Sequence, residues 1–320
     1  MSRKVIASAR ILPPMLIGMV HVPALPATPA ARLSIAEIID IACYEAHFLE
    51  SIGFDAILIE NMHDAPYLYQ TIGPEITAAM TAICARVRAA VKIELGVQVL
   101  AACNREALAV ALASNLNFIR AENFAFAHVA DEGLMPTADA GPLLRYRRQI
   151  GADHIRIYAD VKKKHAAHAI TGDVSLDDAV HGAIFCGADG VIITGSATGK
   201  AAAPADVAAA NRAGAPRVLV GSGITAANLH QYWPIADGFI VGSSLKFDGD
   251  WRNDIDASRA AELVARAREL SGTNLQPVSG TGLQPVSPTV PQKGRRAQGA
   301  GRTPPHNSRS RKRPGKRGAS

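Results

Sequence analysis

The feature that most limits the fold of this chain is a regular alternation of short apolar runs with helical patterns. Eight runs read as buried strands, at residues 16–20, 54–60, 92–100, 117–121, 154–161, 190–194, 217–221 and 238–242. Repeated βα units favour a parallel sheet covered by helices. Eight units in one chain match the size of a single closed (β/α)8 barrel with right-handed crossovers.

Capping signals place several of the helices between these strands. Ser34 with Glu37, and Ser175 with Asp178, have the spacing of a capping box, and Pro74 suits a first helical turn. A doubly wound open sheet is the competing fold. No Gly-x-Gly-x-x-Gly follows the first predicted strand, so the usual reason to expect a dinucleotide fold is absent.

The N-terminus allows two interpretations. Arg3 and Lys4 precede an apolar stretch, as in a signal peptide, but Arg10 and the Pro13-Pro14 pair interrupt that stretch. We therefore expect residues 1–14 to be an extension and the barrel to begin at residue 15.

The net charge of +6 is unevenly distributed. Residues 272–320 hold 10 Lys or Arg and no Asp or Glu, so the rest of the chain carries 24 − 28 = −4. An acidic body argues against a folded nucleic-acid-binding surface. The segment 272–320, rich in Pro, Gly, Ser and Arg, predicts a disordered basic tail that binds nucleic acid or an anionic membrane weakly at most.

Cysteine spacing and hydropathy exclude several further classes. The four cysteines are widely separated and form no Cys-x-x-Cys pair, which argues against a structural zinc site or a disulfide framework. No apolar run is long enough for a transmembrane helix. We expect a cytoplasmic protein of residues 15–271, with reduced thiols and no cofactor, plus the tail.

Glycine-rich loops follow the last two predicted strands, where (β/α)8 barrels commonly hold a phosphate. Backbone N–H groups of residues without a Cβ can approach an anion closely, and a following helix adds its positive end. The alternative is that these glycines only make tight turns. The ligand candidates from the loops after the last three strands are Thr194, Gly195, Gly221, Ser222, Gly223, Gly242, Ser243 and Lys246.

The fifth predicted strand has a polar row. Arg156, Tyr158 and Asp160 alternate with apolar residues, so they face the barrel interior if the apolar row meets the helices. A buried Asp160 needs a cationic partner, for which Lys162, Lys164 and Arg120 are candidates. An internal ion pair without chemistry is the alternative to a catalytic role.

Other polar residues follow the apolar runs at the ligand end of a barrel. The catalytic candidates are Asp160, Lys164, Glu60 and His165, and further ligand candidates are His21, Asn61 and Asp64. Glu60, Asp64, His21 and His165 are also metal-ligand types, but no fixed-spacing motif supports a metal site, so none is predicted. Lys162 or Lys164 is an option for a Schiff base, and Cys103 has no activating neighbour.

Several segments carry a family resemblance. They are 17–26 (IGMVHVPALP), 60–66 (ENMHDAP), 72–81 (IGPEITAAMT), 143–147 (LLRYR), 194–199 (TGSATG), 219–225 (LVGSGIT) and 236–246 (ADGFIVGSSLK). Together they resemble the BtpA family, which is named for photosystem I biogenesis.

The resemblance implies a barrel of the ribulose-phosphate-binding type and a role in photosystem I assembly. It also implies polar residues at His21, Glu60, Asn61, Asp64, Asp160, Lys164 and His165. The chain departs from the family pattern at 101–103, where Ala-Ala-Cys stands in place of Arg-Asn-Asp, and at Glu122, in place of Asn.

Two functions follow as expectations. The first is the binding of a phosphorylated small metabolite at the carboxyl ends of the strands, with acid/base or lyase chemistry. The second is a non-catalytic assembly factor that contacts photosystem proteins or a membrane surface.

Overall fold

The computed structural model describes residues 13–195 and 197–272. The expectations for an N-terminal extension before residue 13 and for a disordered basic tail after residue 272 lie outside these residues. The apolar stretch near the N-terminus forms a buried barrel strand that begins at Met15, so the strand interpretation is confirmed.

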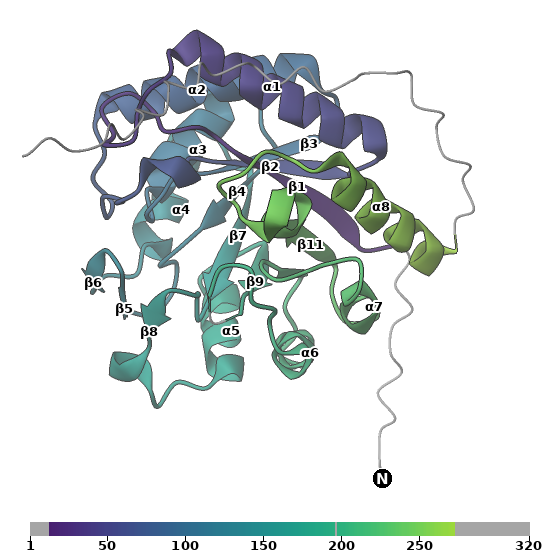
Figure 1. Ribbon diagram of the computed structural model, residues 1–320. Coiled ribbons are helices and arrows are strands. Elements are labelled where there is room, and N and C mark those ends of the chain that lie inside the picture. The colour runs from purple at the N-terminus through teal and green to yellow at the C-terminus, as the bar shows by residue number, and fades with distance from the viewer. Residues whose placement is uncertain (1–12, 196, 273–320) are drawn as a thin grey trace, which may run out of the picture. The chain divides into compact units, whose positions relative to one another are not determined.

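The predicted closed barrel is confirmed. Eight parallel strands close in the order β1-β11-β10-β9-β7-β4-β3-β2 (Figure 1). Their bounds are β1 Met15–His21, β2 Ala56–Glu60, β3 Glu94–Gln98, β4 Phe118–Ala121, β7 Arg156–Val161, β9 Gly190–Ile193, β10 Val218–Val220 and β11 Gly238–Val241. All eight correspond to predicted runs, most of them one or two residues shorter at an end.

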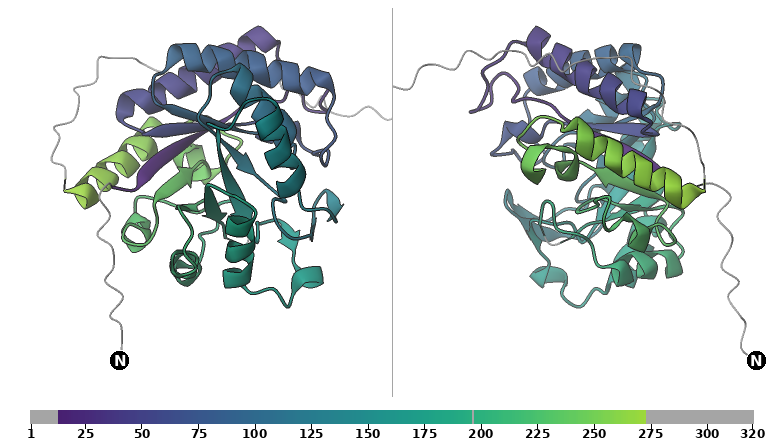
Figure 2. Two further views of the ribbon diagram at one scale, coloured as in Figure 1. Left: turned by 180° about the vertical axis from the view of Figure 1, so that it is seen from behind. Right: turned by 45° about the vertical axis from the view of Figure 1, so that its right-hand side comes forward.

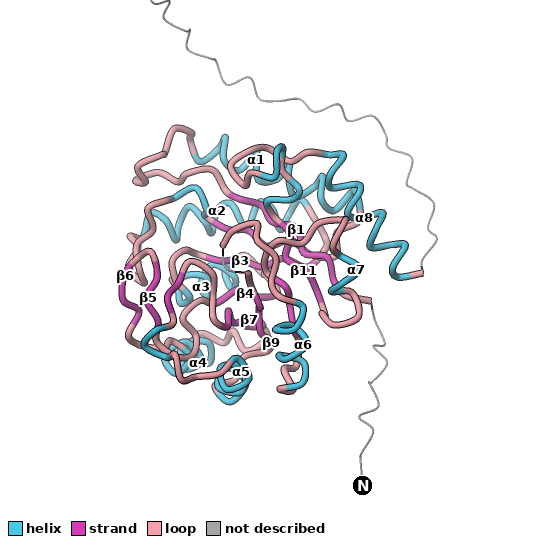
Figure 3. Tube along the Cα trace, turned by 60° about the horizontal axis from the view of Figure 1, so that its bottom comes forward, coloured by secondary structure: helices cyan, strands magenta, loops and turns pink. Residues whose placement is uncertain are grey.

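Helices surround these strands, as the tube view shows (Figure 3). They are α1 Ile35–Ile52, α2 Pro74–Ala90, α3 Asn104–Ala113, α4 Ala140–Gln149, α5 Leu176–Phe185, α6 Pro204–Arg212, α7 Leu229–Tyr232 and α8 Ala257–Ser271. The views in Figure 2 keep α1 and α2 side by side on one side of the barrel. Within the described residues, no helix is long and apolar enough to cross a membrane.

The predicted helix starts are also confirmed. Ser34 and Ser175 each form a complete capping box, with Glu37 and Asp178 respectively. Each box satisfies two N–H groups that a helix start leaves without an intrahelical partner.

The alternation of side chains along each strand divides the core into two layers. Apolar residues such as Ile57, Ile157 and Val191 face the helices, and Leu58, Tyr158 and Ile192 fill the barrel interior. Gly96 has no room for a side chain, because a Cβ there would lie 2.2 Å from the Phe118 ring. The interior below the ligand end is therefore a packed core, and polar residues gather above it.

A small antiparallel sheet lies beside the barrel and was not predicted. It pairs β5 His128–Ala130 with β6 Gly133–Met135 and β8 Ala166–Ala167 (Figures 1 and 3). These strands have two or three residues each, too few for a periodic pattern to be detected in the sequence. The hairpin turn between β5 and β6 carries Asp131 and Glu132 to the mouth of the barrel.

Candidate active site

A cavity of about 400 Å3 opens at the carboxyl ends of the barrel strands. This is the end at which (β/α)8 barrels bind ligands, and the volume suits a small molecule. Nine of the predicted site residues line it: His21, Glu60, Lys164, His165, Gly221, Ser222, Gly223, Gly242 and Ser243. Six do not: Asn61, Asp64, Asp160, Thr194, Gly195 and Lys246.

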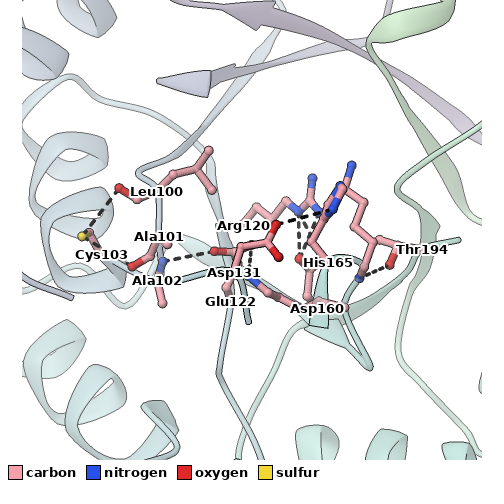
Figure 4. Close-up of polar contacts among 12 residues, drawn as sticks. Leu100, Ala101, Ala102, Cys103, Arg120, Glu122, Asp131, Asp160, His165 and Thr194 are labelled. Carbon is pink, nitrogen blue, oxygen red and sulfur yellow. Dashed lines mark hydrogen bonds and ion pairs between the residues drawn. The ribbon is translucent and has the colours of Figure 1, made fainter. Parts of the chain in front are cut away.

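Arg120 of β4 and Asp160 of β7 form a buried ion pair just beneath this cavity (Figure 4). The Nε and Nη2 atoms of Arg120 donate to Oδ1 and Oδ2 of Asp160 at 3.1 and 3.0 Å. The interior-facing row predicted for β7 is therefore correct, and Arg120 is the partner of Asp160. Because both carboxylate oxygens accept from the guanidinium, Asp160 holds Arg120 in place at the cavity floor, where Arg120 is exposed to a ligand.

A second buried pair joins Glu122 and Lys163. Lys163 Nζ donates to Glu122 Oε1 at 3.1 Å, and the other carboxylate oxygen accepts from the Ala102 backbone N–H at 3.1 Å (Figure 4). Burial alone would raise the pKa of Glu122, but Lys163 and Arg120 hold it below its ordinary value. Glu122 is thus an ionised residue that fixes the loop after β3 to the loop after β7.

The side chains of Lys164 and Glu60 differ from these pairs, because neither has a hydrogen-bonded partner among the described residues. The backbone N–H of Lys164 donates to Thr194 Oγ1 at 3.0 Å. Burial, and then the Arg120 guanidinium, lower the pKa of the Lys164 amine. Burial raises the pKa of Glu60, although Arg120 and Lys164 oppose the rise. Burial therefore favours the neutral form of both groups more strongly than water does.

His21 completes this part of the site. Its Nδ1 lies 3.3 Å from the Trp251 carbonyl oxygen, which can only accept, so Nδ1 carries the proton and Nε2 is unprotonated. Burial and nearby Lys246 lower the pKa of His21 to about 3. The Nε2 atom lies 3.9 Å from Glu60 Oε2, and a neutral imidazole at this position does not stabilise an ionised Glu60.

The loops after β10 and β11 form a cradle of backbone N–H groups. Those of Gly223, Ser243 and Ser244 have no hydrogen-bond partner within residues 13–195 and 197–272. Gly223 has φ +68, and a Cβ there would lie 2.2 Å from Ala201 N, so only glycine fits. The elements that follow, α7 and a 3-10 turn at Ser243–Leu245, are too short to add the expected helix dipole.

Hydrogen bonds hold the neighbouring loop against this cradle. Ser222 Oγ accepts from the Gly195 N–H at 2.7 Å and donates to the Lys200 carbonyl oxygen at 2.8 Å. Among the described residues, the Thr194 hydroxyl accepts one hydrogen bond, from the Lys164 backbone N–H. Thr194, Gly195 and the Ser222 hydroxyl therefore position the loops around the cavity.

Three other predicted ligand residues serve the fold. Asp64 accepts from the Leu25 N–H at 2.8 Å and from Asn61 Nδ2 at 2.8 Å, and Asn61 Oδ1 accepts from the Leu100 N–H. Lys246 is buried and donates to Glu45 Oε1 of α1 at 2.6 Å. The amine of Lys246 is therefore turned away from the cavity, toward the helical layer.

His165 lies at the rim of the cavity and is exposed. Its Nε2 atom is 2.8 Å from Thr198 Oγ1. Its Nδ1 atom is 3.7 Å from Asp131 Oδ2 (Figure 4). His165 thus connects the β5–β6 hairpin with the loop after β9, across the mouth of the cavity. Its side chain is 43% exposed, which suits a rim residue better than an acid/base group.

Gln98 and Ser244 face the ligand space and were not among the site residues predicted from the sequence. Gln98, at the end of β3, lines the cavity, is 2% exposed, and has no partner for either Oε1 or Nε2 among the described residues. A polar residue in the apolar run 92–100 was the available signal, since Gln98 shares a strand face with Gly96 and Glu94.

Metal-ligand types do not come together at this site. Within the described residues, no group of three or more His, Cys, Asp or Glu side chains is placed to hold a metal ion. Asp64, one of the four metal-ligand types noted in the sequence, is occupied by Leu25 and Asn61. Cys103 is buried, and burial raises the pKa of its thiol to about 12, in line with an inert residue.

Comparison with known proteins identifies the family. A sequence model described as "BtpA family" matches residues 14–269. The chain belongs to the BtpA family. A relative from Caenorhabditis elegans, "Uncharacterized protein F13E9.13, mitochondrial", is 43% identical over 262 residues, which are 80% of this chain and 94% of that protein. The "Photosystem I biogenesis protein BtpA" of Synechocystis is 36% identical over 79% of this chain and 88% of its own.

The barrel of this BtpA-family chain also resembles a solved structure. "Thiamine phosphate pyrophosphorylase from Pyrococcus furiosus" superposes with a TM-score of 0.50 at 13% sequence identity, covering 80% of this chain and 96% of that one. At this identity the likeness shows the fold alone.

Proposed function

We propose that this chain binds a phosphorylated small metabolite in the barrel cavity and acts on it by acid/base chemistry. The observation that carries the proposal is the cradle of unpartnered N–H groups at Gly223, Ser243 and Ser244, on the wall of a cavity that also holds Arg120. These three residues are half-buried, and their N–H groups can donate to the oxygens of a phosphoryl group.

Two titratable groups elsewhere in the cavity support a chemical step. Lys164 and Glu60 are the titratable groups there without hydrogen-bonded partners among the described residues, and their pKa values are displaced toward neutrality. Groups of this kind can donate and accept protons, whereas Asp160, Glu122 and Lys163 are held in ion pairs.

A thermal-shift screen tests the binding step. The full chain is heated with inorganic phosphate, with triose, pentose and hexose phosphates, and with the same sugars lacking phosphate. A ligand at about 100 times its Kd adds roughly 2.7 kcal/mol to the unfolding free energy, which gives a measurable rise in Tm. If no phosphorylated compound raises Tm above the unphosphorylated sugars, the proposal is wrong.

A pair of charge variants locates the site. Ser243→Asp places a carboxylate in the cradle, so it should abolish the shift caused by the phosphorylated ligand. Ser51→Asp is the matched control, because Ser51 is exposed near the end of α1, at the opposite end of the barrel. Loss of the shift in both variants, or in neither, would place the phosphate elsewhere.

An assembly role remains the second candidate, because the Synechocystis relative carries the name of a photosystem I biogenesis protein. Its partners would be photosystem proteins or a membrane surface. Relatives from a nematode and from archaea, organisms without photosystem I, favour the metabolite function for the shared barrel. Complementation of a Synechocystis strain lacking its relative separates the two: an assembly factor tolerates Ser243→Asp, and a metabolite enzyme does not.

A further inference from the structure

Three consecutive lysines follow β7, and the structure gives each a different environment. Lys162 Nζ donates to the Val174 carbonyl oxygen at 2.6 Å, and Lys163 Nζ is paired with Glu122. Lys164 Nζ has no hydrogen-bond or ion-pair partner within the described residues and lines the cavity. Lys163 and Lys164 both line the cavity, and of these two amines only that of Lys164 has no bonded partner among the described residues.

The surroundings of Lys164 favour the nucleophilic form of an amine. The residue is mostly buried, and the Arg120 guanidinium, fixed by Asp160, belongs to the same cluster. Desolvation and a neighbouring cation both disfavour the ammonium ion. The backbone bond from Lys164 to Thr194 Oγ1 holds the start of the side chain in position at the strand end.

A proton donor lies in the same cluster. Glu60 lines the cavity, and its carboxyl group accepts no hydrogen bond from any described residue. His21 presents an unprotonated Nε2 toward it at 3.9 Å, so no cation at His21 drives Glu60 to ionise. An amine whose neutral form is favoured, in one cluster with a carboxyl group whose protonated form is favoured, suits condensation with a carbonyl compound.

We propose that Lys164 forms a Schiff base with the carbonyl carbon of a phosphorylated aldehyde or ketone bound in the cavity. This inference rests on the proposed function, and the cradle of the β10 and β11 loops would hold the phosphoryl group. The unpartnered Gln98 amide, which can both donate and accept, would bind a hydroxyl group of the same ligand.

The step is balanced by groups already in the site. The Lys164 nitrogen lone pair attacks the carbonyl carbon, and the C=O π pair moves to oxygen, which takes a proton from the attacking nitrogen to give a neutral carbinolamine. Protonation of its hydroxyl group by Glu60 allows water to leave as the C=N bond forms. The products are an iminium ion, water and the Glu60 carboxylate, and no oxidant or reductant takes part.

Reductive trapping tests the inference. The full chain is incubated with triose, pentose or hexose phosphates, each with and without sodium borohydride, and analysed by intact mass and peptide mapping. We expect an adduct of the reduced sugar phosphate on Lys164, formed at least tenfold faster than with the corresponding unphosphorylated sugar. The rate should reach half its maximum at a pH below the ordinary lysine pKa of 10.5.

Two matched variants control for surface labelling and for misfolding. Lys164→Met should lose the adduct, and Lys162→Met should keep it, because the Lys162 amine is bonded to Val174 outside the cavity. Both proteins should melt cooperatively, and both should retain the Tm shift given by inorganic phosphate.

The outcomes separate this inference from the proposed function. An adduct on any other lysine, one that persists in Lys164→Met, or none with any sugar phosphate would overturn the Schiff base. If the phosphate-dependent Tm shift persists in those cases, the chain still binds a phosphorylated metabolite but forms no Schiff base with it. If the shift is absent as well, the proposed function fails too.

Discussion

Arg120 and Asp160 face each other across neighbouring strands, with two guanidinium nitrogens donating to two carboxylate oxygens inside the barrel. The side chains of the pair are 5% and 1% exposed. The pair joins β4 to β7 and also fixes the Arg120 guanidinium at the cavity floor, near Lys164 and Glu60.

Arg120→Met should be strongly destabilising, because it leaves a buried carboxylate without a partner. Removing one member of a buried ion pair costs about 3–5 kcal/mol, whereas replacing both members by apolar residues often costs much less. We expect the urea midpoint of Arg120→Met to fall sharply and that of Arg120→Met with Asp160→Leu to recover in part.

The control for this prediction is Arg148→Met. Arg148 and Asp153 form an ion pair of almost the same length, 3.1 Å, but their side chains are 82% and 50% exposed. Such surface pairs contribute about 0–1 kcal/mol. Equal losses in Arg120→Met and Arg148→Met would show that the Arg120–Asp160 pair has no special role.

The sequence was sufficient to predict the fold because local signals agreed with the global pattern. Capping boxes at Ser34 and Ser175, and Pro74 at a first turn, marked helices in the positions that a (β/α)8 barrel requires. Interior-facing residues of β7 followed from strand parity alone. The sheet of β5, β6 and β8 was missed because pairing between distant short segments leaves no local periodicity.

The site was harder to predict than the fold, since the role of a polar residue depends on its partner. Lys246 and Asp64 follow strands as ligand residues do, yet they are bonded to Glu45 and Leu25. Nothing local in the sequence distinguishes Lys163, which is paired, from Lys164, which is not. The alternation of side chains along β3 and β4 predicts that Gln98 and Glu122 face the barrel interior, because Gln98 is two residues from Gly96 and Glu122 is two residues from Arg120.

Cysteine reactivity gives a direct check on burial. Cys84 and Cys103 are buried, and burial raises the pKa of both thiols, whereas Cys43 and Cys186 are partly exposed. The thiolate is the reactive species, so iodoacetamide at neutral pH should alkylate Cys43 and Cys186 well before the other two. Peptide mapping over time measures the order, with the urea-unfolded chain as control. Early alkylation of Cys103 in the folded protein would contradict its placement.

His21 should make the protein less stable in acid. Its pKa is about 3 when folded and near 6.5 when unfolded, so the unfolded chain binds a proton first as the pH falls. The stabilisation is fully present above about pH 6.5 and is lost progressively toward pH 3. By about pH 5 this residue alone should remove about 2 kcal/mol of the unfolding free energy.

His21→Gln isolates this contribution, since it removes the titration and retains a polar side chain. The loss of unfolding free energy between about pH 7 and about pH 5 should be smaller in this variant by about 2 kcal/mol. His181→Gln, on the exposed side of α5, is the control and should behave as the unchanged protein does. A parallel pH dependence in His21→Gln and the unchanged protein would show that His21 is not buried as a neutral group.

Gln98 should show a conflict between stability and ligand binding. Its two polar side-chain atoms are buried without partners, and each such group costs about 1–3 kcal/mol. Gln98→Leu has a similar volume and removes both, so we expect it to raise the urea midpoint. If the Gln98 amide binds the phosphorylated ligand, Gln98→Leu should also weaken the phosphate-dependent Tm shift. Gln149→Leu, exposed on α4, should change neither quantity. A Gln98→Leu variant that is less stable and binds the ligand as before would contradict this role. Gln98 would then contribute to the packing of the barrel and not to ligand binding.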